Sequence, residues 1–161
     1  MRTLLLLALV SGCSSAPTKL YSGDGELVSL RLHNLTDERD AQIIGYAGRL
    51  WDLVGAHIRL ETEESGGQLL DVYLTTDHIK PSEGCVKSTP TAIIDGCYDE
   101  VDSVVRLDVN VDNEFGVMAH ELGHAIGLHH IPIAGSLMYY EAGIELTDAD
   151  ILAYDQVWGS K

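Results

Sequence analysis

The sequence predicts an α+β domain in which helices pack against a mixed, twisted β-sheet, and three observations support this fold class. Apolar and polar residues alternate, as they do in half-buried strands, within residues 26–34, 57–62 and 69–76. Apolar residues recur at helical spacing between residues 36 and 55 and again within residues 147–159. The length of 161 residues suits one domain with a single core.

The first predicted strand, within residues 26–34, leads into an amphipathic helix. Thr36 is expected to be the N-cap of this helix, with Asp37 and Glu38 in the first turn, where acidic side chains interact favourably with the helix dipole. Gly55 ends the helical pattern. One side of the helix is apolar and is expected to back the core; it carries Ile43, Ala47, Leu50, Trp51 and Val54.

Further strands are expected after this helix. The strands at residues 57–62 and 69–76 are separated by a connection that contains two glycines. After a loop at residues 80–90, strands are predicted at residues 91–95 and 103–111, on either side of an acidic turn. Because helices then follow the strands, a mixed sheet is predicted rather than a regular alternation of strands and helices.

Two helices complete the predicted fold. The first contains the sequence AHELGHAIGLHHI, residues 119–131, and is expected to carry the active site. An irregular segment separates it from a C-terminal helix, for which Thr147 and Asp150 form a predicted capping box. The apolar stripe of the C-terminal helix consists of Ile151, Tyr154, Val157 and Trp158.

The first residues predict an export signal. Residues 1–12 combine a basic residue, an apolar run and small residues, and the run is too short to span a bilayer. The sequence VSGC resembles a bacterial lipobox, which predicts that Cys13 is lipidated and becomes the mature N-terminus. Ordinary signal cleavage after Ala16 is the alternative.

The sequence also predicts where the exported protein resides. Ser14 follows the lipobox cysteine, at a position where aspartate would indicate retention in the inner membrane. We therefore expect a lipid-anchored protein of the bacterial cell envelope, in the outer membrane where one is present. Small polar residues make residues 13–25 a tether, and residues 26–161 are expected to form the folded domain.

The charge balance limits the classes of partner. Ten Lys and Arg residues oppose 25 Asp and Glu residues, which gives a formal net charge of -15. Such a surface repels phosphate backbones and attracts cations, so nucleic acid is not an expected partner. An acidic run is interpreted as a solvated loop, with a calcium (Ca2+) site as the alternative; it consists of Asp95, Asp99, Glu100 and Asp102.

The remaining cysteines predict a disulfide. Export places Cys85 and Cys97 in an oxidising compartment, and they bracket a short, turn-rich segment. We expect a Cys85–Cys97 disulfide that closes a small loop. The alternative, that one thiol binds a metal, is less favoured because neither cysteine belongs to a CxxC pair.

The histidine-rich segment has the spacing of a metal site. His120 and His124 are four residues apart, so a helix projects both imidazoles from one face, with Glu121 beside them. At Gly127 the chain can leave the helix with a positive φ and turn back to offer His130 as a third ligand. Three imidazoles leave a fourth tetrahedral position for water, as in catalytic zinc (Zn2+) sites.

The pattern HExxHxxGxxH, followed by SLMYY, is similar to the signature of the metzincin metallopeptidases. The step of eight residues from His130 to Met138, the stretch NEFGVMAHELGHAIGL and the closing LTDADILAYDQVWG most resemble the matrixins, the family of matrix metalloproteinase-like catalytic domains. The resemblance implies a zincin-type fold and a zinc-dependent endopeptidase. It also implies that His120 and His124 join His130 as zinc ligands, that Glu121 is the general base, and that Met138 forms the apolar floor of the site.

Three features depart from the matrixin pattern. His129 stands where matrixins usually carry aspartate, and we expect it to be a surface or supporting residue and not a ligand. Tyr140 stands where matrixins usually have proline, as tyrosine does in astacins and serralysins, so it either stabilises an oxyanion or only packs in the turn. No cysteine-switch sequence occurs, and latency through a cleaved pro-region is not expected.

The resemblance also indicates how substrate binds. Metzincins pair an extended peptide with an edge strand, and residues 91–95 are the predicted edge. Val117 and Tyr139 are expected near the specificity pocket. The partner is therefore a protein or peptide substrate, and the chain is expected to be a monomer.

The sequence leaves two alternatives to an endopeptidase, a zinc-stabilised binding module and a cell-wall peptide hydrolase. The chain is either a peptidase or a non-catalytic surface binding module that zinc stabilises, and an intact Glu121 favours the peptidase because a structural site needs no base. A cell-wall peptide hydrolase would use similar chemistry, but the matrixin-like flanks of the motif favour a protein substrate.

Overall fold

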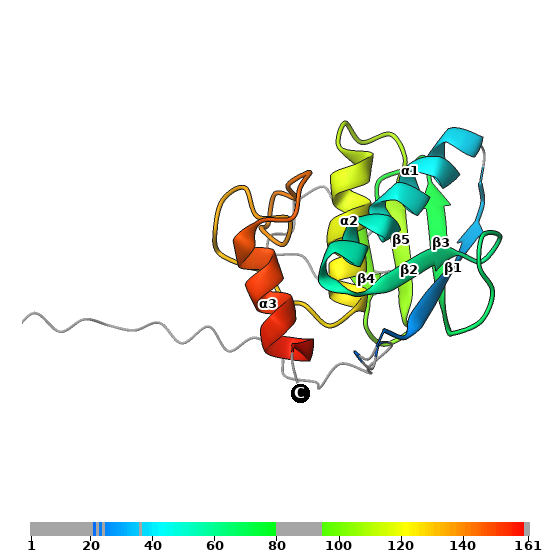
Figure 1. Ribbon diagram of the computed structural model, residues 1–161. Helices are drawn as coiled ribbons and strands as arrows, with labels where there is room; N and C mark the ends of the chain where they lie inside the picture. Colours follow the sequence, from blue (N-terminus) through cyan, green and yellow to red (C-terminus); the bar gives the residue numbers. More distant parts are fainter. Residues whose placement is uncertain (1–20, 22, 24, 36, 80–94, 160–161) are drawn as a thin grey trace, which may run out of the picture.

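The computed structural model describes residues 21, 23, 25–35, 37–79 and 95–159, and Figure 1 shows their arrangement. Five strands form one sheet with the spatial order β2-β1-β3-β5-β4. Neighbouring strands pair in parallel except β4, which runs antiparallel to β5 at one edge. The strands are β1 (Leu27–His33), β2 (His57–Leu60), β3 (Gln68–Thr75), β4 (Gly96–Asp99) and β5 (Val104–Asp108). The mixed sheet confirms the predicted fold class.

Three helices accompany the sheet: α1 (Glu38–Leu50), α2 (Glu114–Ala125) and α3 (Asp148–Trp158). Helices α1 and α2 pack together on one face of the sheet (Figure 1), and α3 contacts the short turn that follows α1. A short 3-10 turn, η1 (Trp51–Val54), continues α1 and ends at Gly55, whose φ of 90° is left-handed. In the described part of the chain, no helix has the length and apolar character needed to cross a membrane.

The N-cap of α1 differs from the prediction by one residue. The cap is Asp37, which has extended backbone angles and whose side chain accepts a hydrogen bond from the backbone N–H of Arg39. Thr36, the predicted cap, lies outside the described residues. Threonine and aspartate both cap helices well, so local preference could not distinguish these two neighbours. The residue at which α1 begins depends instead on which of its side chains face the core, among them the fully buried Ile44 and Ala47.

The core lies between the sheet and the two helices α1 and α2. Trp51 is fully buried, and its indole Nε1–H donates a hydrogen bond to the carbonyl oxygen of Ala119, 3.0 Å away in α2. At Gly48 a Cβ would lie 2.9 Å from the carbonyl oxygen of Ile58, so glycine lets α1 approach β2 closely. These contacts fix α2 relative to the sheet and so position the side of the helix that carries His120 and His124.

The exposed edge of the sheet next to α2 is β4. The sequence predicted an edge strand at residues 91–95, of which only Asp95 lies within the described residues. The edge strand that the structure describes begins one residue later, at Gly96. Strand β4 packs against both β5 and α2, which brings the outer strand of the described sheet close to the histidine segment.

The beginning of the described chain packs against the C-terminal helix. Tyr21 is 1% exposed, and its hydroxyl lies 2.9 Å from the hydroxyl of Tyr154 in α3. Its ring meets the ring of Trp158 edge-on, with centroids 5.2 Å apart. Tyr21 therefore belongs to the core, although the sequence predicted that residues 13–25 form only a tether.

Candidate metal centre

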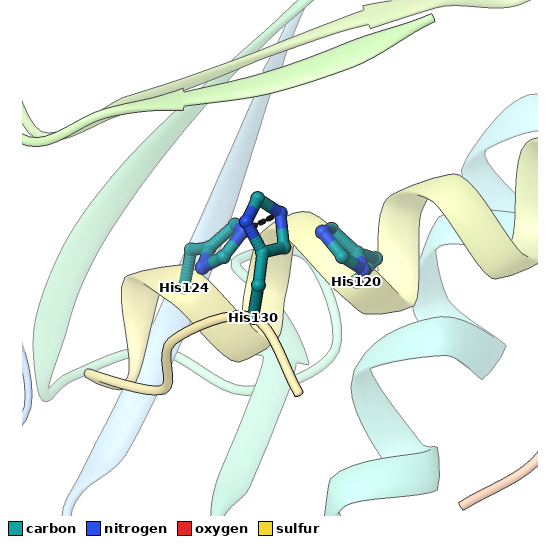
Figure 2. Close-up of side chains that lie close together, drawn as sticks. All are labelled: His120, His124 and His130. Atoms are coloured by element: carbon teal, nitrogen blue, oxygen red, sulfur yellow. Dashed lines mark hydrogen bonds between the residues drawn. The ribbon is translucent and has the colours of Figure 1, made fainter. Parts of the chain in front are cut away.

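Helix α2 and the segment after it bring three histidines together. Figure 2 shows His120 and His124 on α2, with His130 reaching back toward them from the following loop. One nitrogen from each imidazole lies within 4.8 Å of the others. This is the one such group of three or more potential metal ligands among the residues that the structure describes. His129 is exposed and is not part of the group.

The chain reverses at Gly127 as predicted. Its φ of 92° is in the left-handed region, and its N–H donates to the carbonyl oxygen of His124. The N–H of Leu128 donates to the carbonyl oxygen of Gly123, which completes the helix C-terminus. Trp158 of α3 covers this turn, and its Nε1–H donates to the carbonyl oxygen of Ile126 at 2.7 Å. Backbone hydrogen bonds at the end of α2 and the hydrogen bond from Trp158 of α3 thus fix the reversal of the chain.

Hydrogen bonds orient two of the imidazoles. Nδ1 of His120 lies 2.7 Å from the carbonyl oxygen of Leu137, and Nδ1 of His124 lies 2.8 Å from the carbonyl oxygen of Leu128. A carbonyl oxygen only accepts, so each Nδ1 must carry the proton. In the neutral imidazole, Nε2 then keeps a free lone pair, which is the form that binds a metal.

The nitrogens of His124 and His130 have the spacing found in zinc sites. Nε2 of His124 and Nε2 of His130 are 3.3 Å apart, the pair joined by the dashed line in Figure 2. Two nitrogens on a tetrahedral zinc ion, each at 2.0–2.1 Å from it, lie roughly 3.3 Å apart. Nitrogen donors without thiolates, with a position left over for water, are typical of catalytic zinc sites.

Burial keeps the three imidazoles neutral. Burial lowers the pKa of His120 and of His130, and it lowers the pKa of His124 to about 3. For His124 this value already includes the effect of the neighbouring imidazoles, which lower the pKa because two positive charges this close would repel each other. Neutral imidazole is the state that binds a metal, so little proton release is needed at neutral pH.

Glu121 is buried beside this group. Its exposed fraction is 7%. Burial raises the pKa of Glu121 to about 8 in the metal-free protein, and a hydrogen bond from the backbone N–H of Tyr98 acts in the opposite direction. The carboxyl is therefore held between α2 and β4, one residue from His120.

Gly96 makes this close approach of β4 possible, and sequence reasoning missed it. A Cβ at Gly96 would lie 2.4 Å from Cγ1 of Val117 and 3.0 Å from Cγ of Glu121. Any side chain at this position would displace one of these two groups or the strand itself. A glycine within a strand signals close approach of another group, but the sequence does not indicate which group approaches.

The floor of the site is the turn that contains Met138. Leu137 and Met138 are both fully buried. A Cβ at Gly123 would lie 2.3 Å from Sδ of Met138, so the glycine between the two α2 histidines makes room for the methionine. Met138 thus packs directly under the helix, as predicted, and Gly123 is a second residue that sequence reasoning missed.

A single carboxylate, Asp150 of α3, holds this turn. Asp150 is fully buried and accepts hydrogen bonds from the Ser136 hydroxyl at 2.5 Å and from the backbone N–H groups of Leu137 and Met138 at 3.0 and 2.9 Å. It also accepts from the N–H and hydroxyl of Thr147, which confirms the predicted capping box. Because the carbonyl of Leu137 accepts from His120, Asp150 supports a metal-site histidine through the turn. The sequence predicted only its capping role.

Tyr140 lies against the histidine group but is largely exposed. Its ring centroid is 4.6 Å from that of His130, and 68% of the residue is exposed. Tyr139 lies next to it, with ring centroids 5.6 Å apart. This position is compatible with both predicted roles, packing in the turn and hydrogen bonding to a reacting group.

Other predicted features lie partly or wholly outside the described residues. Cys97 is buried in β4, but Cys85 is not described, so the Cys85–Cys97 disulfide stays a prediction. Residues 1–12 and the lipidation position Cys13 are likewise not described. In the acidic run, Asp99 is buried and accepts hydrogen bonds from the N–H groups of Val101 and Asp102, an arrangement typical of a turn.

Comparison with known proteins gives one result. A family model described as matrixin matches residues 55–159, which include β2, the histidine group and α3. No curated protein matches the chain.

Proposed function

Because the chain belongs to the matrixin family of zinc-dependent peptidases, we propose that it is an endopeptidase that cleaves proteins or peptides at the site formed by His120, His124 and His130. One observation supports this most strongly. The three imidazoles offer nitrogen donors that lie within 4.8 Å of one another, a donor set typical of catalytic zinc sites, and a buried carboxylate lies beside them. A binding module that needs zinc only for stability has no use for that carboxylate.

In the proposed mechanism, Glu121 transfers the proton. When bound, zinc supplies a Lewis acid for the peptide carbonyl and makes a water molecule more acidic. Glu121 accepts the proton of the attacking water and then donates it to the leaving amine. The hydrogen bond from the N–H of Tyr98 holds the carboxylate in one orientation for both steps.

Strand β4 supplies the proposed binding surface for the substrate backbone. The carbonyl oxygen of Asp95 accepts from the N–H of Asp108 at 2.8 Å, so Asp95 faces β5. Backbone groups alternate in direction along an antiparallel strand, so the N–H and carbonyl of Gly96 and the carbonyl of Tyr98 point away from β5 and are offered to the substrate, while the N–H of Tyr98 binds Glu121. An extended peptide that pairs with this edge would run beside Glu121, which is the β-augmentation mode of recognition.

Metal removal tests the proposed activity. We expect the purified protein to contain close to one zinc per chain and to cleave a denatured protein. A chelator should abolish cleavage and added zinc should restore it. Zinc retained without cleavage of any protein would identify a binding module, and cleavage restricted to cell-wall peptides would identify a cell-wall hydrolase.

Gly96→Ala is expected to impair cleavage without removing zinc. The added methyl group would collide with Val117 or Glu121 and move the general base or β4, and misplacement by about 1 Å costs roughly 10- to 100-fold in kcat/KM. The measurement is kcat/KM together with bound zinc. Gly45→Ala in α1 is the control, because the nearest atom to its Cβ would be Cδ1 at the flexible end of Leu60, at 3.3 Å. Equal kcat/KM for the two variants would refute a positioning role for Gly96.

We further propose that the Tyr140 hydroxyl donates a hydrogen bond to the oxyanion that forms during peptide cleavage. Its ring already lies 4.6 Å from that of His130. Loss of such a donor from Tyr140→Phe should lower kcat by roughly 10- to 100-fold and leave KM nearly unchanged. An unchanged kcat would assign Tyr140 to packing alone.

We also propose that the protein is exported and anchored in the cell envelope by lipid on Cys13, with a Cys85–Cys97 disulfide and no further subunit. A Cys13→Ser protein should fail to incorporate labelled fatty acid and should leave the membrane fraction; continued membrane association would contradict the anchor.

Without reduction, Cys85 and Cys97 should resist alkylation, and modification of both thiols would contradict the disulfide.

A further inference from the structure

The first residue of α2, Glu114, is buried without a hydrogen-bond partner. Its exposed fraction is 4%. Both carboxylate oxygens are inaccessible to solvent and accept no hydrogen bond within the described part of the chain. A buried carboxylate without hydrogen bonds is costly, so such a group is either neutralised or paired with a cation. Burial raises the pKa of Glu114, and the charge of Asp40 adds to that effect.

Asp40, in the first turn of α1, is the second carboxylate of this cluster. It is 5% exposed, and burial raises its pKa as well. Nη1 of Arg39 lies 3.6 Å from Oε2 of Glu114 and 3.9 Å from Oδ1 of Asp40. Two buried carboxylates from the N-terminal turns of α1 and α2 therefore lie within 4 Å of the same guanidinium nitrogen.

Arg39 satisfies neither carboxylate well. Both distances exceed the 2.7–3.2 Å of an N–H···O hydrogen bond. The Arg39 side chain is 68% exposed, so its guanidinium can move into solvent at little cost. A cation that bound both carboxylates directly would replace these long contacts.

We propose that Asp40 and Glu114 bind a divalent cation of the Ca2+ type, with Arg39 displaced toward solvent. The donors are carboxylate oxygens, which suit hard cations such as Ca2+, with water completing the coordination. Neither histidine nor cysteine is part of the cluster, which argues against zinc. The location differs from the histidine group and from the acidic run at residues 95–102, which was the only calcium site considered from the sequence.

The expected affinity is modest. Two protein carboxylates are fewer ligands than a high-affinity calcium site supplies, so a Kd on the order of 0.1–1 mM is expected, as in extracellular calcium modules. At 10 mM Ca2+ the bound ion should raise the Tm of the zinc-loaded protein by roughly 3–6 °C. The site would join the first turns of α1 and α2 and so strengthen the packing of the helix that carries His120.

Thermal unfolding of the purified, zinc-loaded protein with Ca2+ as the probe tests this site. Sodium chloride at equal ionic strength corrects for screening of the acidic surface. In Glu114→Gln the Ca2+-dependent rise in Tm should fall below about 1 °C, whatever the absolute Tm of the variant. Glu38→Gln is the matched control, because it removes the same charge from an exposed position in the same helical turn as Asp40, and it should respond like the wild type.

The outcomes separate a cation site from the alternatives. An equal rise in Tm for the wild type and Glu114→Gln, or no rise in either, would overturn the proposal. Arg39→Ala should bind Ca2+ several-fold more tightly, because the competing cation is gone. If Arg39→Ala instead lowers Tm and Ca2+ raises the Tm of neither this variant nor the wild type, Arg39 is the counterion and the cation site is refuted. None of these readouts depends on peptidase activity.

Discussion

Replacing Glu121 with glutamine is expected to lower kcat/KM for peptide cleavage by roughly 10²- to 10⁴-fold, the usual contribution of a general acid–base group. Bound zinc should be unchanged, because the three histidines keep their positions. The fold should also tolerate the neutral side chain, since burial already raises the pKa of Glu121 to about 8 in the metal-free protein. The measurement is kcat/KM, with zinc content and Tm determined on the same samples.

Glu141→Gln is the control for this experiment. Glu141 is exposed and lies three residues after Met138, so the variant removes the same charge close to the site without touching the buried carboxyl. Its kcat/KM should equal that of the wild type. Wild-type cleavage by Glu121→Gln would show that another group moves the proton.

Asp150→Asn is expected to have the largest effect on stability. The carboxylate accepts five hydrogen bonds, and an amide would turn an NH2 group toward buried donors. Leaving these groups unpaired should cost about 3 kcal/mol, a fall in Tm of roughly 6–12 °C. Movement of Leu137 would also disturb His120, so zinc affinity should fall roughly 10- to 100-fold.

Asp148→Asn provides the comparison for Asp150. Asp148 lies in the same first turn of α3 but is exposed, so its substitution should change Tm little. Equal losses of Tm and zinc affinity in both variants would refute the specific role of Asp150. The effect of Asp150→Asn would then reflect only the loss of a charge near the N-terminus of α3.

The Asp150 network also predicts how stability depends on pH. Burial alone would raise the pKa of Asp150, but the hydrogen bonds from Ser136, Thr147 and Met138 outweigh it and hold the pKa below its usual value. A carboxyl with a lowered folded-state pKa stabilises the fold above its unfolded pKa, about 3.9, and this stabilisation is lost as the pH falls through the folded pKa. The unfolding free energy should therefore decline below about pH 4, and in Asp150→Asn this decline should be smaller.

The local patterns of the sequence predicted much of this structure. Alternation and helical spacing predicted the order of strands and helices, and the motif spacing predicted the group of His120, His124 and His130 with the reversal at Gly127. Each of these depends on residues within a few turns of one another. The α1 cap, Asp37, was missed by one residue, because its neighbour Thr36 also caps helices well. Of the predicted edge strand at residues 91–95, only Asp95 lies within the described residues, directly before β4.

The contacts that the sequence did not predict join distant parts of the chain. Gly96 meets Glu121 across 25 residues, and Trp51 reaches Ala119 across 68. Asp150 binds the turn at Met138 from another helix. Periodicity identifies which side of an element faces the core but not which atom it meets there. These residues became recognisable only once the sheet and helices were assembled.

The packing of Tyr21 against α3 limits the distance between the folded domain and the proposed lipid anchor. With lipid on Cys13, as proposed, eight peptide steps separate the bilayer from a residue fixed in the core, and they span at most about 29 Å when fully extended. That reach is comparable to the thickness of the hydrocarbon layer itself. The catalytic domain would therefore stay within about 29 Å of the membrane surface. It would cleave proteins that reach that surface and not those that diffuse farther away.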